Sequence, residues 1–126
     1  MVGLGYDKDI LQRMPASLSG GMRKRAALAR SIAIKPEVIL YDEPTTGLDP
    51  ANIERIGAMI QKLQRELGVT SIVVTHDMPI AFKRSDRVAM LWQRKFPYIG
   101  TPEEIQNHPA REVSDFINGR YYEDQD

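Results

Sequence analysis

The chain contains no cysteine and no long apolar run, and its charges balance. Without cysteine it can form neither a disulfide framework nor a thiolate metal site. No apolar stretch approaches the roughly 20 residues that a helix needs to cross a bilayer, and residues 1–9 lack the pattern of a secretory signal. Lys plus Arg and Asp plus Glu each number 17, so no global field favours nucleic acid or an acidic membrane. We expect one domain, soluble by itself, whose membrane role comes only through a partner.

A further absence concerns nucleotide chemistry. Nowhere does the sequence contain Gly-x-x-x-x-Gly-Lys followed by Ser or Thr. That loop cradles nucleotide phosphates with its backbone N–H groups, and its hydroxyl helps to hold magnesium. The chain is therefore not expected to hold a nucleoside triphosphate by this route.

Two carboxylates follow a short apolar run at residues 38–41, which is typical of a buried parallel strand. Ligands of open α/β sheets collect outside the carboxyl ends of the strands, where Asp42 and Glu43 would emerge. Asp42 is placed to hold a hard cation, directly or through water, and Glu43 to take a proton from water. The alternative for this pair is a solvated acidic turn.

A second apolar run, residues 70–74, is expected to form another buried strand, and His76 follows two residues after it. The helix expected between the two strands, residues 50–67, begins after Asp49, a good N-cap, and carries its apolar residues at spacings of three and four. A parallel βαβ unit would bring His76 to the sheet edge that carries Glu43. A lone histidine at a strand end is otherwise more often structural than catalytic. The apolar stripe of the helix comprises Ile53, Ile56, Ile60, Leu63 and Leu67.

Ser19, Gly20 and Gly21 precede a basic, alanine-rich helix expected over residues 22–35. The first N–H groups of a helix have no partner within it, and glycine allows close approach, so this turn is suited to an anion. The alternative is an ordinary N-cap in which the serine bonds to its own first turn. The basic residues expected to face outward are Arg23, Lys24, Arg25 and Arg30, and the buried stripe comprises Leu28, Ala29, Ile32 and Ala33.

The remaining segments complete an alternating α/β pattern. Asp77 is expected to cap the helix that follows it. The other expected elements are a connector over 2–16 with a short helix near 7–13, helices near 78–84, 102–107 and 111–117, strands over 87–91 and 98–100, and an acidic tail over 121–126.

Four motifs, in this order, resemble those of ABC-transporter ATPase domains: the signature motif, the Walker B motif, the D-loop and the switch histidine. The resemblance runs over residues 2–120 and implies an α/β, partial P-loop NTPase (RecA-like) fold that lacks the phosphate-loop strand. A complete domain of the family is about twice as long, so residues 1–126 would be its carboxyl-terminal half, with a signature-motif segment over 1–35 and the rest of the core over 36–126. The motifs are Leu18-Ser19-Gly20-Gly21-Met22, the strand ending in Asp42-Glu43, Thr46-Gly47-Leu48-Asp49 and Thr75-His76-Asp77.

The resemblance also implies roles for individual residues. Glu43 would polarise the attacking water, while His76 would contact the γ-phosphate of ATP and orient that water. Asp42 would hold Mg²⁺, through water, and Asp49 would belong to the loop through which two ATP sites communicate. The residues expected to contact the nucleotide of the opposite protomer are Leu18, Ser19, Gly20, Gly21 and Met22.

The function implied is that of an ATP-binding and hydrolysing subunit that powers transport through a separate membrane permease. Its partners would be a second ATPase protomer and the permease, which would hold it at the cytoplasmic side of the membrane. Met22 stands where glutamine is common in the family, and this departure, with the stretches 100–105 and 116–119, resembles the Mla and Mkl lipid-transport branch. Lipid or organic-solvent transport is the subtype this predicts.

Two alternatives remain open at the level of sequence. One is a truncated, catalytically inactive protein that acts only by binding other proteins. The other is a chromosome-maintenance ATPase, although no sustained heptad pattern of a coiled coil is present. For any of the three, the chain alone is predicted not to hydrolyse ATP. Because a sheet without its phosphate-loop strand leaves backbone groups unpaired and apolar surface uncovered, we also expect the chain to be marginally stable or prone to self-association.

Overall fold

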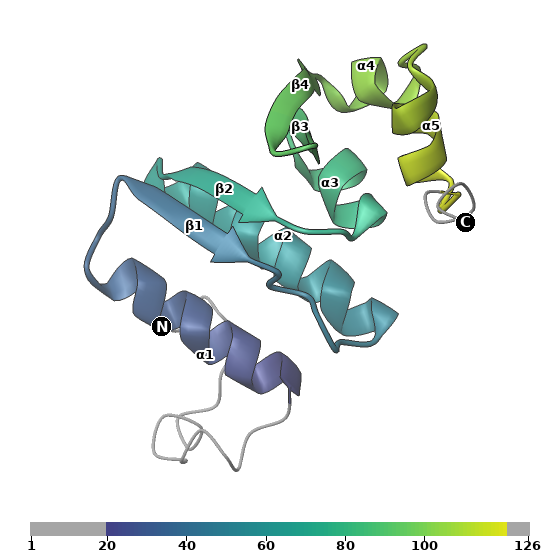
Figure 1. Cartoon of the computed structure of the whole chain (residues 1–126). Coiled ribbons are helices and arrows are strands. Elements are labelled where there is room, and N and C mark those ends of the chain that lie inside the picture. The colour runs from purple at the N-terminus through teal and green to yellow at the C-terminus, as the bar shows by residue number, and fades with distance from the viewer. Residues whose placement is uncertain (1–19, 121–126) are drawn as a thin grey trace. The chain divides into compact units, whose positions relative to one another are not determined.

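The computed structural model describes residues 20–120, which form two compact units, 20–76 and 77–120 (Figure 1). Leu18, Ser19, the short helix predicted near 7–13 and the tail predicted over 121–126 lie outside these residues. No helix within 20–120 is long and apolar enough to span a bilayer.

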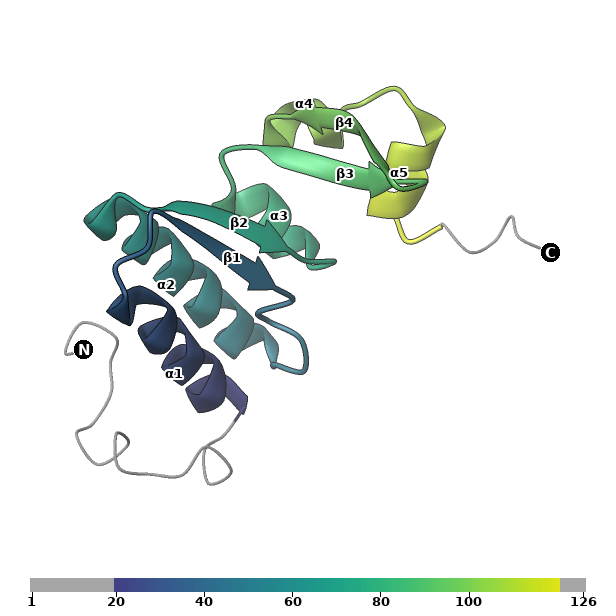
Figure 2. The same cartoon turned by 60° about the vertical axis from the view of Figure 1, so that its left-hand side comes forward.

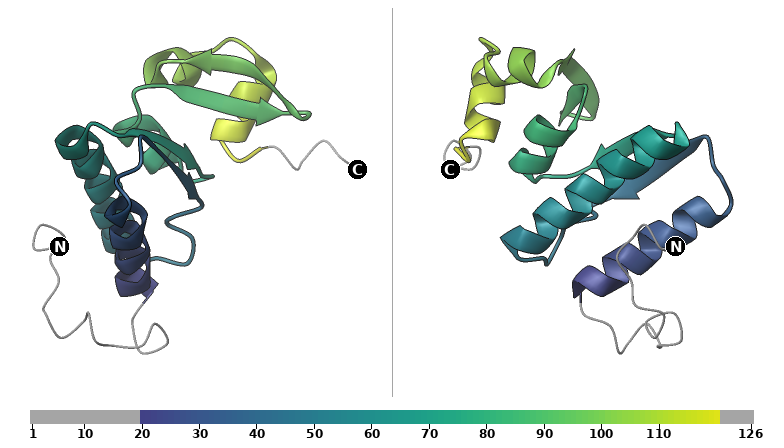
Figure 3. Two further views of the ribbon diagram at one scale, coloured as in Figure 1. Left: turned by 90° about the vertical axis from the view of Figure 1, so that its left-hand side faces the viewer. Right: turned by 180° about the vertical axis from the view of Figure 1, so that it is seen from behind.

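The first unit is a βαβ arrangement preceded by a helix. Its elements are α1 (Gly20–Ala33), β1 (Val38–Asp42), α2 (Pro50–Leu67) and β2 (Thr70–Val74). The two strands pair in parallel, as predicted, with a register that runs from Val38↔Thr70 to Asp42↔Val74. Helix α2 connects them, and α1 and α2 lie side by side beneath one face of the two-stranded sheet (Figures 2 and 3).

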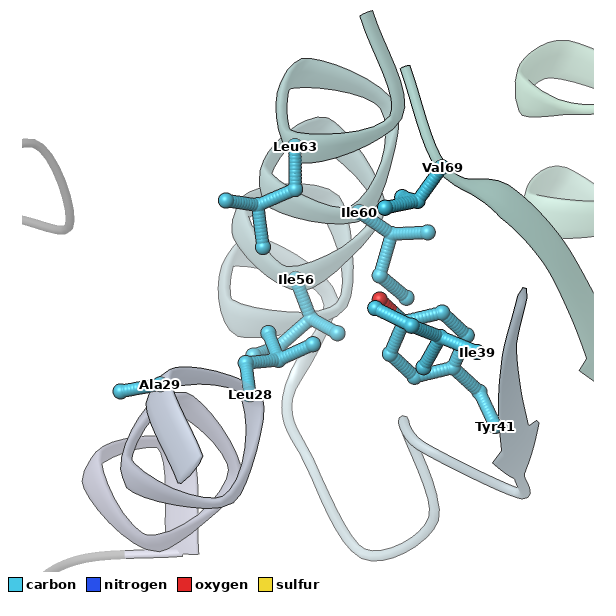
Figure 4. Close-up of a cluster of buried hydrophobic side chains, with 8 residues drawn as sticks. All are labelled: Leu28, Ala29, Ile39, Tyr41, Ile56, Ile60, Leu63 and Val69. Carbon is cyan, nitrogen blue, oxygen red and sulfur yellow. The ribbon is translucent and has the colours of Figure 1, made fainter. Parts of the chain in front are cut away.

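The core of this unit lies between the sheet and the two helices. Alternate residues of β1 face the helices, because successive side chains of a strand point to opposite sides. Full burial of a large apolar side chain contributes about 1.5–3 kcal/mol. Burial also raises the pKa of Tyr41, whose ring packs among the aliphatic side chains, and the nearby Ser71 hydroxyl partly offsets this rise. The cluster comprises Leu28, Ala29, Ile39, Tyr41, Ile56, Ile60, Leu63 and Val69 (Figure 4).

The opposite face of the sheet is open to solvent within the described residues. The prediction that the 38–41 and 70–74 strands are buried is wrong for the residues on one face, because the helices of this unit cover only the other face of the strands. The predicted helix stripes also end early, since Ala33 and Leu67 are exposed at the last turns of α1 and α2. The exposed apolar residues of the sheet are Val38 (51%), Leu40 (74%), Ile72 (51%) and Val74 (58%).

Local sequence sets the bounds of the helices. Asp49 accepts a hydrogen bond from the backbone N–H of Asn52 and caps α2, Pro50 is its first residue, and Gly68 ends it in a left-handed conformation at φ 64°. Helix α1 begins two residues before the predicted start and ends before Lys35, which has a positive φ of 51°.

The second unit comprises a hairpin and three short helices. These are α3 (Met78–Arg84), β3 (Val88–Trp92), β4 (Lys95–Gly100), α4 (Pro102–Gln106) and α5 (Arg111–Ile117). The strands are antiparallel, and β4 begins three residues earlier than predicted. Gln93 and Arg94 form the turn with φ of 46° and 64°, the left-handed values that a tight hairpin requires. Met90, Ile105 and Val113 form the buried cluster of this unit.

Candidate functional site

The carboxyl ends of β1 and β2 bring two of the predicted site residues into contact. Glu43 directly follows β1 and His76 lies two residues after β2, and because the strands are parallel both ends reach the same edge of the sheet. His76 Nδ1 lies 3.0 Å from Glu43 Oε2, within the distance of an ion pair. Glu43 thus has His76 as a partner at this edge of the sheet, while both side chains remain within reach of water.

The backbone of Glu43 is held in an uncommon conformation. Its φ is 47°, in the left-handed region that a residue with a side chain rarely adopts. Its N–H donates to the Val74 carbonyl at 2.8 Å, and its own carbonyl accepts from the Thr46 N–H at 3.3 Å and from Lys24 Nζ at 3.4 Å. These bonds fix the direction in which the chain leaves the sheet, and with it the direction of the Glu43 side chain. Lys24 was predicted to face outward; instead it is half-buried and ties α1 to this turn.

The Glu43–His76 pair lies at the boundary with water. The side chain of Glu43 is 37% exposed and that of His76 is 75% exposed. Thr46 Oγ1 donates to Glu43 Oε2 at 3.4 Å, so the same oxygen has two neighbouring donors. A carboxylate that is oriented by donors and still reached by water can act as a general base toward that water.

Asp42 lies at the end of β1 and is exposed. Within residues 20–120 no group of three or more acidic, histidine or cysteine side chains is placed to hold a metal ion. A magnesium ion bound to a nucleotide needs only one or two carboxylates, because phosphate oxygens and water complete its octahedral shell. The exposed carboxylate of Asp42 fits this limited role.

The glycine turn of α1 and Asp49 lie on either side of Asn52, in the same unit as the Glu43–His76 pair. Gly20, Gly21 and Met22 form the first turn of α1. Gly21 is buried against Asn52 of α2, and the Asn52 side chain also bonds to Asp49. This hydrogen bond is the main cause that lowers the pKa of Asp49 below its usual value.

Sequence reasoning missed Lys24 and Asn52. The signal for Asn52 was its position in the first turn of the helix that Asp49 caps, where an amide can reach the capping carboxylate. No comparable signal existed for Lys24, because its bond to Glu43 joins residues 19 positions apart.

The amino-terminal part of the chain matches a known family. The sequence profile described as ABC transporter matches residues 1–46. Among similar proteins, the sn-glycerol-3-phosphate import ATP-binding protein UgpC of Vibrio vulnificus (strain YJ016) is 46% identical over 111 residues, which is 87% of this chain and 30% of that protein. The trehalose/maltose import ATP-binding protein MalK of Thermococcus litoralis is 44% identical over 110 residues, 86% of this chain and 30% of its own length.

A third relative, the putrescine transport ATP-binding protein PotG of Escherichia coli (strain K12), is 40% identical over 114 residues, 90% of this chain and 30% of that protein. The chain thus spans about 30% of the length of the curated relatives it matches. The profile and these relatives confirm the predicted resemblance to ATP-binding subunits of ABC transporters.

A solved structure shows the same fold. The dimeric post-hydrolysis state of the ATP-binding cassette MJ0796, bound to ADP and Pi, superposes with a TM-score of 0.68 at 33% identity, over 79% of this chain and 42% of that one. The predicted α/β fold class, a partial P-loop NTPase with parallel strands and connecting helices, is confirmed.

Proposed function

This chain is related over most of its length to the ATP-binding domains of ABC transporters, and from that premise we propose that it supplies one part of the ATP-hydrolysing site of a transporter subunit. The observation that carries the proposal is the contact between Glu43 and His76 at the carboxyl ends of two parallel strands. In an open α/β sheet this edge is where ligands bind.

Glu43 acts in this proposal as the general base. Its carboxylate takes the proton of the attacking water, while His76 holds the carboxylate and the γ-phosphate in a fixed relation to that water. Lys24 Nζ donates to the Glu43 carbonyl and the Glu43 N–H donates to the Val74 carbonyl, and these two bonds keep the base from swinging away when the nucleotide leaves. Positioning of this kind is the main contribution that a protein makes to phosphoryl transfer.

ATP and Mg²⁺ are the proposed ligands. Asp42 would hold the ion through water, and the ion would neutralise charge on the phosphates. The sequence contains no phosphate-loop motif, and in this proposal a separate polypeptide segment supplies that loop.

A second protomer is the proposed partner. Ser19, Gly20 and Gly21 would contact the γ-phosphate of ATP held by the opposite protomer, and the flanking Leu18 and Met22 would line the same contact. The exposed Asp49 would lie near the junction of the two sites. Support comes from the solved relative, which is described as dimeric and bound to ADP and Pi.

A membrane permease is the other proposed partner, which would place the chain at the cytoplasmic face of the membrane. The lipid subtype predicted from Met22 gains no support from the relatives reported above, whose names specify a glycerol phosphate, sugars and putrescine. We therefore propose a transporter ATPase that powers import of a small polar solute, as the names of these similar proteins suggest.

Replacement of Glu43 by Gln tests the assignment of the base. In a complete domain formed from this chain and a phosphate-loop segment, the variant should bind ATP but hydrolyse it at least 100-fold more slowly, since general-base catalysis contributes roughly 10²–10⁴. ATP should then hold two protomers together, which light scattering after size exclusion would detect as a stable dimer. A variant with unchanged turnover would exclude Glu43 as the base.

An inactive protein that acts by binding other proteins is the second candidate. The specific observation in its favour is the exposed apolar sheet face formed by Val38, Leu40, Ile72 and Val74. Apolar surface of this kind, gathered on one face, is typical of an interaction site. Recovery of Glu43-dependent hydrolysis on addition of a phosphate-loop segment separates the two candidates, because a purely binding protein gains no turnover.

A further inference from the structure

The first turn of α1 lies against the first turn of α2, and the contact is made where α1 has no side chain. A Cβ atom placed on the buried Gly21 would lie 3.0 Å from Oδ1 and 3.1 Å from Cγ of Asn52. These distances are shorter than the roughly 3.5–4.0 Å of an ordinary carbon contact. The amide of Asn52 therefore occupies the room that glycine leaves at this position.

The other end of the same amide holds Asp49. Asn52 Nδ2 donates to Asp49 Oδ1, and the Asn52 backbone N–H donates to Asp49 Oδ2 at 3.3 Å. An ionised carboxylate can only accept hydrogen bonds, so the NH₂ group must face Asp49 and the amide oxygen must face Gly21. One side chain thus touches both the glycine turn and the D-loop.

The side-chain bond is additional to helix capping. To cap α2, Asp49 needs only the backbone N–H at position 52, which almost any residue supplies. The Asn52 amide adds a second donor whose direction is set by the packing against Gly21. A substitution that removes the amide while keeping the backbone N–H therefore separates the two effects.

We propose that Asn52 is a positioning residue that fixes Asp49 relative to the glycine turn of α1, so that these two segments move as one body. The functional consequence rests on the proposed function: a change where the glycine turn contacts one nucleotide would be transmitted to Asp49, near the second nucleotide site. In this account a Cβ atom at position 21 presses on the Asn52 amide and shifts it by a few tenths of an ångström. Coupling of this kind has to be measured between the two positions, because proximity alone does not demonstrate it.

The test follows the Asp49 carboxyl group by carbon-13 NMR titration of the full chain. Asn52→Ala should raise the pKa of Asp49 toward its ordinary value, because the hydrogen bond that lowers it is lost. Gly21→Ala should raise it in the same direction, because the added Cβ pushes the amide away. In the Asn52→Ala background, Gly21→Ala should cause no further change in the pKa of Asp49. Ser31→Ala, later on α1, serves as the control and should leave the titration unchanged.

Two results would overturn the proposal: an Asp49 pKa that does not respond to Gly21→Ala, or a response of equal size with and without Asn52. Should Gly21→Ala prevent folding, thermal unfolding of the double variant decides. If adding Asn52→Ala restores folding, the contact between a Cβ at position 21 and the Asn52 amide is supported as the cause. If the double variant stays unfolded, the proposal is contradicted. No nucleotide enters these measurements, so their failure and the failure of the proposed ATPase function are distinguishable.

Discussion

Glu43, the proposed catalytic base, has an uncommon backbone conformation. A positive φ in a residue with a side chain costs about 1–3 kcal/mol and persists only where the surroundings enforce it. Here the enforcing contacts come from β2, from the following turn and from Lys24 of α1. The direction of one carboxylate is therefore set by three segments that are separate in sequence.

Tyr98 and Glu112 form the clearest pH-dependent pair in the second unit. The Tyr98 hydroxyl donates to the Glu112 carboxylate, which lowers the pKa of Glu112 and raises that of Tyr98. Since the folded pKa of Glu112 is depressed, its contribution to stability is present above the unfolded value of about 4.3 and is lost as the pH falls through the folded pKa.

Tyr98→Phe should therefore lower the stability of the second unit at neutral pH and have a smaller effect in acid, where Glu112 is protonated in both states. The matched titration should show the pKa of Glu112 rising toward its ordinary value. Denaturant unfolding at several pH values, with Tyr98→Phe compared to the parent, measures the first effect. A loss of stability that is equal at neutral and acid pH would contradict the assigned contact.

At the scale of elements, caps and turns set most boundaries, and these were readable from sequence. Asp49 and Gly68 bound α2 because one supplies an acceptor to the first turn and the other adopts a left-handed φ at little cost. The meeting of Glu43 with His76 was predictable because parallel strands end at one edge. The one-sided burial of β1 was not predictable, since an apolar run does not show whether other elements pack on one face of the strand or on both.

Helix α4 offers a test of capping at this scale. The Thr101 hydroxyl accepts from the Glu104 N–H at 3.2 Å, and the Glu104 carboxylate accepts from the Thr101 N–H at 2.8 Å. Thr101→Val keeps the size but removes the acceptor, so the free energy of unfolding should fall by about 1 kcal/mol. Thr101→Ser is the matched control and should lose less than half as much. Equal losses in the two variants would show that the hydroxyl does not cap α4.

At the scale of the whole molecule, residues 20–76 form a sheet of two strands, and among the described residues helices cover one face of this sheet and leave the other exposed. Two strands with an open apolar face are marginal in water unless something packs on them. The solved relative contains more than this chain does, since only 42% of it has a counterpart here.

The chain should for this reason self-associate as its concentration rises. Leu40→Thr combined with Ile72→Thr removes apolar surface from the centre of the exposed face while keeping residues that favour strands. Sedimentation velocity should then show a species closer to the monomer mass than the parent gives at equal concentration. Leu67→Thr, which removes an exposed leucine from α2 instead, is the control. Association that is unaffected by the sheet variant would show that another surface is responsible.

We propose above all that the chain carries the base, the switch histidine and the signature turn of an ATPase whose phosphate loop another segment supplies. Phosphate release from millimolar Mg-ATP tests it most directly, measured for the chain alone, with a separate polypeptide that carries the phosphate loop, and for the mixture with Glu43→Gln. Losing several charge-assisted hydrogen bonds, each worth roughly 1.5–3 kcal/mol, should leave the chain alone inactive. The mixture should hydrolyse ATP, and Glu43→Gln should slow that hydrolysis by about 100-fold or more. Glu43-dependent turnover by the isolated chain, or a mixture that turns over equally well with Glu43→Gln, would contradict the account.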